Sequence, residues 1–263
     1  MRLGANMDVR FGATVEEFVE YLVELGLEHV ELTTEYLQAH PDAPDPETVG
    51  EITSVHDVSV TYHAPFRDWN LGSFNDDSAQ AGVMQVKQTL DAAATAGAGA
   101  VVVHGGSVPR RYPDWVRETG RRNAVESLRA CAEHAAEVGV QLCLENQPFD
   151  SRDERHTVGP DALAETLDAV DVDPDALGIT LDVGHASVND TDWREYVERF
   201  GDRITVCHLH DNDGESDAHE PLPEYEPIVD AVDAPYNVFE MKTVADVAAC
   251  LETQPDHIPQ AQP

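Results

Sequence analysis

The chain has 263 residues, of which 51 are acidic and only 16 are basic, so its formal net charge is −35. A chain of this length can bury a substantial core, as one large domain or as two small ones. Because it contains no run of about eighteen apolar residues, the sequence excludes a membrane-spanning helix.

The predicted strands are short apolar runs, rich in β-branched residues, that recur along the whole chain. They occupy residues 2–7, 29–34, 58–63, 100–105, 140–145, 178–183, 204–209 and 237–242. Stretches with helical periodicity separate these runs, so strands and helices alternate throughout.

The helices show both amphipathic spacing and end signals. Residues 14–25 carry an apolar stripe at three- and four-residue spacing, with glutamates on the opposite face. Residues 75–97 open with Asn and Asp and close at Gly97, and residues 113–139 open with Pro-Asp and close at Gly139. Prolines interrupt residues 222–232, which gives the weakest helical pattern.

Eight strand–helix units within about 250 residues predict a closed (β/α)8 TIM barrel of class α/β. The alternative, an open doubly wound sheet, lacks its early glycine-rich phosphate motif, because residues 3–12 contain no GxGxxG. We assign the barrel to residues 1–253 as one domain. Residues 254–263 are polar and proline-rich, and we expect a flexible C-terminal tail.

The negative charge is dispersed over nearly every predicted helix, and only Lys87 and Lys242 are lysines. Such a charge repels itself in dilute buffer, but at about 1 M salt the Debye length is only about 3 Å. We therefore interpret the composition as adaptation to a high-salt cytoplasm, as in halophilic archaea. A chain selected to bind cations or basic partners would concentrate its acidic residues in one patch.

The cysteines and the N-terminus indicate a cytoplasmic protein. Cys131, Cys143, Cys207 and Cys250 lie far apart in apolar or alanine-rich stretches, without a CxxC pair. This spacing predicts buried free thiols in a reducing compartment, because a disulfide framework would need closer and more regular spacing. Residues 1–18 have no long apolar core and do not resemble a signal peptide.

Histidine, aspartate and glutamate, which can bind metals, are concentrated at the predicted strand ends and in the loops that follow them. The C-terminal ends of barrel strands meet at one mouth, so these residues should lie together. A single histidine at a strand end is usually a hydrogen-bonded core residue, but so many charged groups at buried positions are costly unless they are paired or bound to metal. The set is His63, His104, Glu145, Asp182, His185, His208, His210, Asp217, His219 and Glu240.

The chemistry of these residues narrows the choice of metal. Mixed imidazole and carboxylate ligands suit Zn²⁺, Mn²⁺, Co²⁺ or Fe²⁺ better than Ca²⁺. Without thiolates the set does not resemble a structural zinc site. Within residues 207–222 we expect His208 to be the buried ligand, with His210 facing the same way and nearer to the mouth.

Seven short motifs carry a resemblance to a known family. In order they are TYHAPF, VVVHGG, LCLENQ, LDVGHA, CHLHDNDG, DAH and FEMK. Over residues 2–250 the chain resembles the xylose isomerase-like TIM-barrel superfamily, which includes sugar-phosphate isomerases and epimerases and endonuclease IV. The isomerase branch implies one divalent metal (Mn, Co, Zn or Mg), held by Glu145, Asp182, His208 and Glu240, with the two glutamates exchanging the substrate proton.

The endonuclease IV branch implies a second reading of the same residues. Its extra ligands for a trinuclear zinc cluster match His63 and His104, the pair Asp182 and His185, and the pair Asp217 and His219, so up to three metals are expected on this alternative. Binding duplex DNA usually takes several Lys or Arg contacts, and this chain has few cations. Nucleic acid is therefore the disfavoured partner.

The sequence thus predicts a metal-dependent sugar or sugar-phosphate isomerase or epimerase that works through an enediolate in carbohydrate metabolism. The alternative hypothesis is an endonuclease IV-like enzyme that acts on abasic DNA, and a third hypothesis is a non-catalytic metal-binding barrel. We expect Arg67 and Trp69 to contact the substrate. A homo-oligomer is left open.

Overall fold

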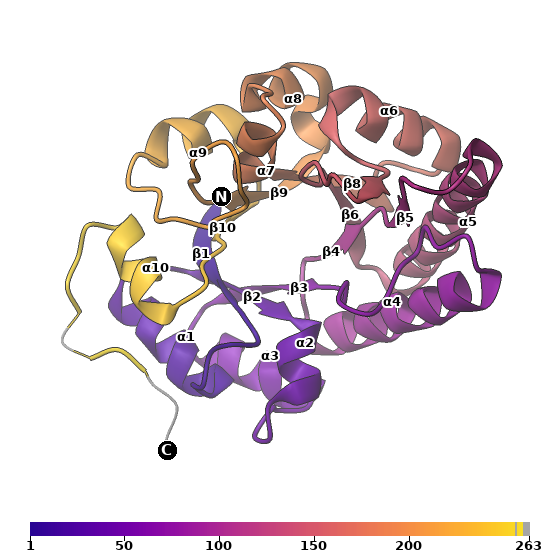
Figure 1. The fold of residues 1–263 in the computed structure, drawn as a ribbon. Helices are drawn as coiled ribbons and strands as arrows, with labels where there is room; N and C mark the ends of the chain where they lie inside the picture. The colour runs from indigo at the N-terminus through magenta and orange to yellow at the C-terminus, as the bar shows by residue number, and fades with distance from the viewer. Residues whose placement is uncertain (256, 260–263) are drawn as a thin grey trace.

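The alternation of β-branched runs and amphipathic helices closes into a barrel in the computed structural model, which describes residues 1–255 and 257–259. Eight parallel strands follow one another around the ring in the order β1-β10-β9-β8-β6-β4-β3-β2, so that the first strand pairs with the last (Figure 1). These strands are β1 (Arg2–Met7), β2 (His29–Thr33), β3 (Ser59–His63), β4 (Ala100–His104), β6 (Gln141–Glu145), β8 (Leu177–Asp182), β9 (Ile204–Leu209) and β10 (Tyr236–Phe239). The predicted (β/α)8 fold is confirmed.

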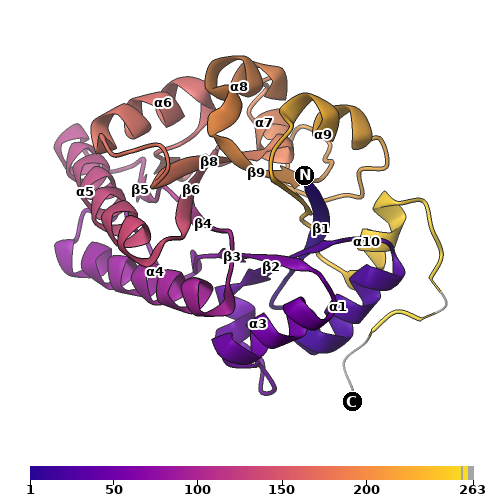
Figure 2. The same cartoon turned by 180° about the vertical axis from the view of Figure 1, so that it is seen from behind.

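Helices surround the strands on the outside of the ring in both views (Figures 1 and 2). They are α1 (Val15–Glu24), α2 (Thr34–Ala39), α3 (Pro46–Val55), α4 (Asp76–Ala96), α5 (Asp114–Val138), α6 (Gly159–Val170), α7 (Val183–Val188), α8 (Trp193–Phe200), the 3₁₀ turn η1 (Gly201–Arg203), α9 (Glu226–Val232) and α10 (Val244–Cys250). None of the helices in the described part of the chain combines the length and the hydropathy that crossing a bilayer requires.

The predicted start of the long helix α4 is confirmed, because the Asn75 side chain accepts a hydrogen bond from the backbone of Ser78. The structure adds a capping box at the start of α1, formed by Thr14 and Glu17. Gly97 and Gly139 end α4 and α5 in the left-handed conformation, at φ 73° and 76°. These ends agree with the predicted ones to within one residue.

The structure corrects three local expectations. The segment 222–232 is helical only from Glu226, because Pro227 fits the first turn of a helix but not its interior. The last strand ends at Phe239, so Glu240 follows the strand instead of lying within it. A separate antiparallel pair, β5 (Ser107–Pro109) and β7 (Asp153–Arg155), was not predicted, since three-residue strands are too short to show an alternating pattern.

The predicted tail is only partly described. Residues 254, 255 and 257–259 have no regular secondary structure. Residues 256 and 260–263 lie outside the described residues, so the flexible tail stays a prediction. The barrel elements themselves run from Arg2 to Cys250.

Alternate residues of each strand face opposite sides, which divides the core into two parts. Outward-facing residues pack against the helices in one large apolar cluster. Inside the barrel a small apolar cluster consists of Ala100, Val102, Cys143, Val206 and Val238.

All four cysteines are buried and free, as the sequence predicts. Burial raises the pKa of Cys131, Cys143 and Cys207 to about 12, so these thiols stay protonated.

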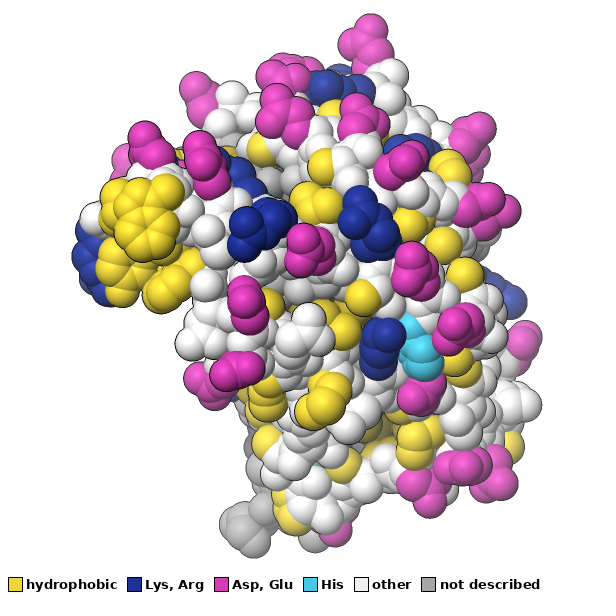
Figure 3. Space-filling model, turned by 90° about the vertical axis from the view of Figure 1, so that its right-hand side faces the viewer, with side chains coloured by type: hydrophobic (Ala, Val, Ile, Leu, Met, Phe, Trp, Pro, Cys, Tyr) yellow, Lys and Arg dark blue, Asp and Glu magenta, His cyan; other side chains and the backbone are white. Residues whose placement is uncertain are grey.

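On the face of the molecule that Figure 3 shows, acidic side chains are scattered between apolar and basic ones. This distribution supports the expectation that salt stabilises the fold by screening repulsion between many carboxylates. We therefore expect the melting temperature to fall when the protein is dialysed from about 1 M KCl into about 10 mM KCl. The measurement is thermal unfolding with divalent metal at the same concentration in both solutions. An unchanged melting temperature contradicts the adaptation to high salt.

His29 lies fully buried inside the barrel, and its burial predicts a pH dependence of stability. Its ring nitrogens lie 2.8 Å from Ser59 Oγ and 3.0 Å from Thr61 Oγ1. Burial lowers the pKa of His29 to about 4. Because the folded-state pKa is below the unfolded value, His29 stabilises the fold above pH 6.5 and loses this effect as the pH falls from 6.5 towards 4.

Between about pH 7.5 and about pH 5.5 this titration should cost about 1 kcal/mol of unfolding free energy. Urea unfolding of the wild type and of His29→Gln at the two pH values measures this contribution. Other titrating groups contribute equally to both proteins, so the difference between the two losses of unfolding free energy belongs to His29. The wild type should lose more stability than the variant. Equal losses contradict the assignment to His29.

Candidate metal centre

The strand ends bring the predicted ligands together at one mouth of the barrel. His63, His104, Glu145 and Asp182 are the last residues of β3, β4, β6 and β8. His208 is the penultimate residue of β9, and the remaining candidates lie on α7 or in the segments after β9 and β10. In the described chain, Glu145, Asp182 and His208 are at most 1% exposed.

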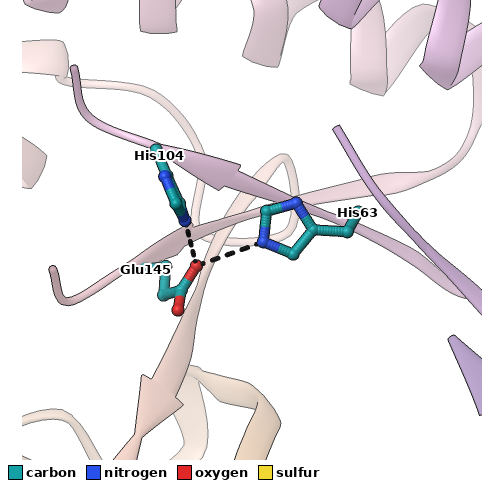
Figure 4. Close-up of side chains that lie close together, drawn as sticks. All are labelled: His63, His104 and Glu145. Atoms are coloured by element: carbon teal, nitrogen blue, oxygen red, sulfur yellow. Dashed lines mark ion pairs between the residues drawn. The ribbon is translucent and has the colours of Figure 1, made fainter. Parts of the chain in front are cut away.

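Glu145 lies between two sets of histidines. Its Oε2 is 2.8 Å from His104 Nε2 and 3.4 Å from His63 Nε2, and both rings point towards this oxygen (Figure 4). Its Oε1 is 3.3 Å from His185 Nδ1 and 3.5 Å from His208 Nδ1. One carboxylate therefore faces two potential metal positions, one with each oxygen.

The central group contains the four residues that the isomerase branch implies. The ligand atoms of Glu145, Asp182, His208 and Glu240 all lie within 4.8 Å of one another. His208 Nδ1 is 3.3 Å from Glu240 Oε2 and 3.8 Å from Asp182 Oδ2. One imidazole and three carboxylates thus converge from four separate places in the sequence.

The other predicted ligands form groups on either side of this centre. His63 and His104 join Glu145 in one group, and Asp182, His185 and His210 form another. A further group contains His210, Asp217 and His219, with His219 Nε2 3.2 Å from Asp217 Oδ2. Every residue predicted as a ligand therefore belongs to at least one group.

The donor atoms fit a divalent cation. Among the described residues, Glu145 Oε2, His208 Nδ1, Asp217 Oδ1 and Glu240 Oε2 are buried and accept or donate no hydrogen bond. Buried polar atoms are costly unless they are satisfied, and a cation in the central group would satisfy His208 Nδ1 and Glu240 Oε2 together. The mixture of nitrogen and carboxylate oxygen suits Zn²⁺, Mn²⁺ or Co²⁺.

The charges of the centre neutralise one another. Burial by itself raises the pKa of Glu145, but His104, His185 and His208 outweigh it and hold this pKa well below the usual range. Burial lowers the pKa of His208, but Glu31 and Glu240 outweigh it and raise this pKa well above its ordinary value. A cation would compete with the histidine protons, so its binding should release protons.

Two adjoining cavities open beside the centre. The larger, of about 470 Å³, is lined by Trp69 together with His104, Glu145 and Glu240. The smaller, of about 270 Å³, is lined by Arg67, whose guanidinium lies over the Phe66 ring and 3.9 Å from Asp8 Oδ2. The two residues predicted to contact a substrate thus lie in neighbouring cavities that share Phe66, Asp217, His219 and Glu240.

Two residues of the centre were not predicted. Asn146 joins β6 to β8, because its side chain donates to Asp182 O at 2.9 Å and accepts from Asp182 N at 2.7 Å. Glu31 lies fully buried with its Oε1 3.0 Å from His208 Nε2. The signal for Glu31 was a carboxylate in the middle of a predicted barrel strand, between Val30 and Leu32.

Comparisons with known proteins find a matching family model and two related proteins. The family model described as "xylose isomerase-like TIM barrel" matches residues 19–261. Two uncharacterized proteins of Methanocaldococcus jannaschii, MJ1311 and MJ1614, are 32% and 31% identical over 66% and 64% of this chain. The matched regions span only 58% and 62% of those relatives.

Among solved structures, a D-tagatose 3-epimerase-like protein is 25% identical, with a TM-score of 0.81, and covers 96% of this chain and 95% of its own. A 3-keto-D-glucoside 4-epimerase from E. coli is 19% identical, with a TM-score of 0.72 and coverages of 96% and 100%. A Thermus thermophilus protein soaked with ZnCl₂ is 24% identical, with a TM-score of 0.71 and coverages of 97% and 100%. The last two likenesses establish the fold alone.

Proposed function

The chain belongs to the xylose isomerase-like TIM barrel family, and from this premise we propose that it is a divalent-metal-dependent isomerase or epimerase of sugars or sugar phosphates. The observation that carries the proposal is the central group of Glu145, Asp182, His208 and Glu240 beside a cavity. The likeness to a D-tagatose 3-epimerase-like protein supports a sugar as the substrate.

The two glutamates have the positions needed to move a proton. Glu145, at the end of β6, and Glu240, directly after β10, lie 3.5 Å and 3.3 Å from His208, and both line the larger cavity. When bound, a divalent metal would act as a Lewis acid that acidifies the C–H next to a sugar carbonyl. Glu145 would accept this proton, which leaves an enediolate, and Glu240 would return a proton to carbon, or the two would exchange roles. Because the pKa of Glu240 also lies well below its usual range, Glu240 would first take up that proton from solvent, and Glu145 would release its own proton to solvent to complete the cycle.

The protonation state of Glu145 suits its role as the base. Its lowered pKa keeps it a carboxylate at neutral pH, ready to accept a proton. Trp69 offers an apolar face in the larger cavity, where a sugar ring would lie. Arg67 offers a cation at the adjoining cavity, where a phosphate or hydroxyl group would lie.

One observation favours a second candidate, metal-dependent cleavage of abasic DNA. The two oxygens of Glu145 face different groups of ligands, as those of a carboxylate bridging two metals would, and the outer groups supply donors for further metals. Against this candidate, the net charge of −35 opposes the approach of DNA. In addition, Lys242 Nζ is engaged by two backbone carbonyls, those of Asp217 and Ala218.

Incubation with a panel of ketoses, aldoses and their phosphates tests the proposal. Each sugar is incubated with Mn²⁺, Co²⁺ or Zn²⁺ in high-salt buffer, and a chelator is the control. We expect metal-dependent conversion of at least one sugar to its isomer or epimer. Metal-dependent cutting of an abasic strand, together with three metals bound per chain, supports the second candidate instead.

A further inference from the structure

Glu31 is a carboxylate placed in the interior of the barrel, where an unpaired charge is very costly. It lies in the middle of β2 and is completely buried. Its Oε1 lies 3.0 Å from Nε2 of His208, which is also completely buried. The proposed reaction gives Glu31 no part, so its position calls for another explanation.

One oxygen of the Glu31 carboxylate has a hydrogen-bond donor, whereas the other oxygen and His208 Nε2, which face each other as an ion pair, have no further partner among the described residues. While Oε1 faces His208, Oε2 accepts a hydrogen bond of 3.0 Å from the Thr61 hydroxyl. Thr61 also lies 3.0 Å from the His29 ring, whose other nitrogen lies 2.8 Å from Ser59 Oγ. This buried polar column follows the register of β2 and β3, in which Glu31 is paired with Thr61.

The two nitrogens of His208 face different surroundings. Nε2 faces Glu31, whereas Nδ1 faces the carboxylates of Glu145, Asp182 and Glu240. In a neutral imidazole the nitrogen that keeps the proton is set by its hydrogen-bond partner, and the other nitrogen is free to bind a metal.

We infer that Glu31 is a positioning residue, which holds the proton of His208 on Nε2 and so presents the Nδ1 lone pair to a divalent cation. Its negative charge also makes the imidazole a stronger ligand. The inference rests on the metal-binding part of the proposed function. It does not depend on which sugar, if any, is the substrate.

Metal affinity separates this role from a purely structural one. The dissociation constant for Zn²⁺ is measured by competition with a chelator for the wild type, Glu31→Gln and Glu31→Leu. We expect the affinity to fall about 10- to 100-fold in Glu31→Leu, and by less in Glu31→Gln, whose amide oxygen still accepts from Nε2–H. His29→Gln is the matched control, since it changes the same column without touching His208, and it should bind zinc as the wild type does.

Histidine NMR supplies the second measurement. In the ¹⁵N-labelled, zinc-loaded wild type, His208 should carry its proton on Nε2 with nitrogen shifts that mark Nδ1 as the metal ligand. The Nε2–H signal should move upfield in Glu31→Gln, because its partner is no longer charged.

The outcomes separate the inference from the function on which it rests. If wild-type protein binds no zinc, the metal centre itself is wrong, and the inference falls with it. If the wild type binds zinc and a folded Glu31→Gln variant has the same affinity and the same His208 signals, Glu31 is only a structural partner. The Gln variant keeps the carboxylate's volume, so the test stands even if Glu31→Leu fails to fold.

Discussion

Replacing Glu145 with glutamine should slow the exchange of carbon-bound substrate hydrogen with solvent about 10²- to 10⁴-fold, the usual loss when a general base is removed. Glutamine keeps an amide oxygen for a metal but cannot accept a proton at neutral pH. Because Glu145 touches four histidines, its replacement should also weaken metal binding. The exchange rate must therefore be divided by the fraction of chains that hold metal.

Two further variants interpret this result. Glu165→Gln makes the same chemical change on the exposed face of α6 and should exchange at the wild-type rate. Glu240→Gln should block turnover but leave partial exchange if Glu145 alone starts the reaction. A Glu145→Gln variant that holds metal and exchanges at a rate comparable to the wild type contradicts the assignment of Glu145 as the base.

Replacing Asp182 with alanine should have the largest effect on stability and on metal content. The Asp182 carboxylate lies 3.1 Å from His210 Nε2 and 3.3 Å from His185 Nδ1, and it caps α7 by accepting from the backbone of His185 at 2.7 Å. Removing the carboxylate leaves buried charges unpaired, which typically lowers the free energy of unfolding by about 3–5 kcal/mol. We expect urea unfolding to show this decrease, together with a large fall in the amount of bound metal.

Asp182→Asn separates the contributions of the carboxylate. The amide oxygen can still cap α7 and fills nearly the same volume, so part of the stability should return, whereas metal content should stay low. His208→Ala should also lower metal content, by removing the single imidazole of the central group. Normal metal content in both alanine variants rules out the proposed site.

The sequence predicted the barrel well, and it indicated which candidate ligands would lie together, because both depend on local patterns. His63, His104 and Glu145 are each the last residue of an apolar run whose end is clear from the sequence. Because the strands of the barrel are parallel, these last residues lie at the same mouth. The helix start at Asn75 and the helix ends at Gly97 and Gly139 are likewise local features.

What the sequence could not provide depends on contacts between distant segments. Nothing local shows that the two oxygens of Glu145 face different histidines, or that Glu31 meets His208 across the barrel. The pair β5 and β7 also escaped prediction, because it depends on the pairing of Ser107 with Arg155 across forty-eight positions of chain. Only the folded arrangement shows which charges neutralise which.

The most direct test of the proposed reaction is proton NMR of sugars in deuterated, high-salt buffer with wild-type protein and Mn²⁺, Co²⁺ or Zn²⁺. An enzyme that forms an enediolate must exchange a carbon-bound hydrogen with solvent whenever the glutamate that removed it exchanges its proton before returning it. We predict metal-dependent loss of one C–H signal next to the carbonyl of at least one ketose, aldose or sugar phosphate, and no loss with chelator. If no sugar in a broad panel exchanges while the same protein cuts an abasic DNA strand in a metal-dependent way, the isomerase assignment is wrong.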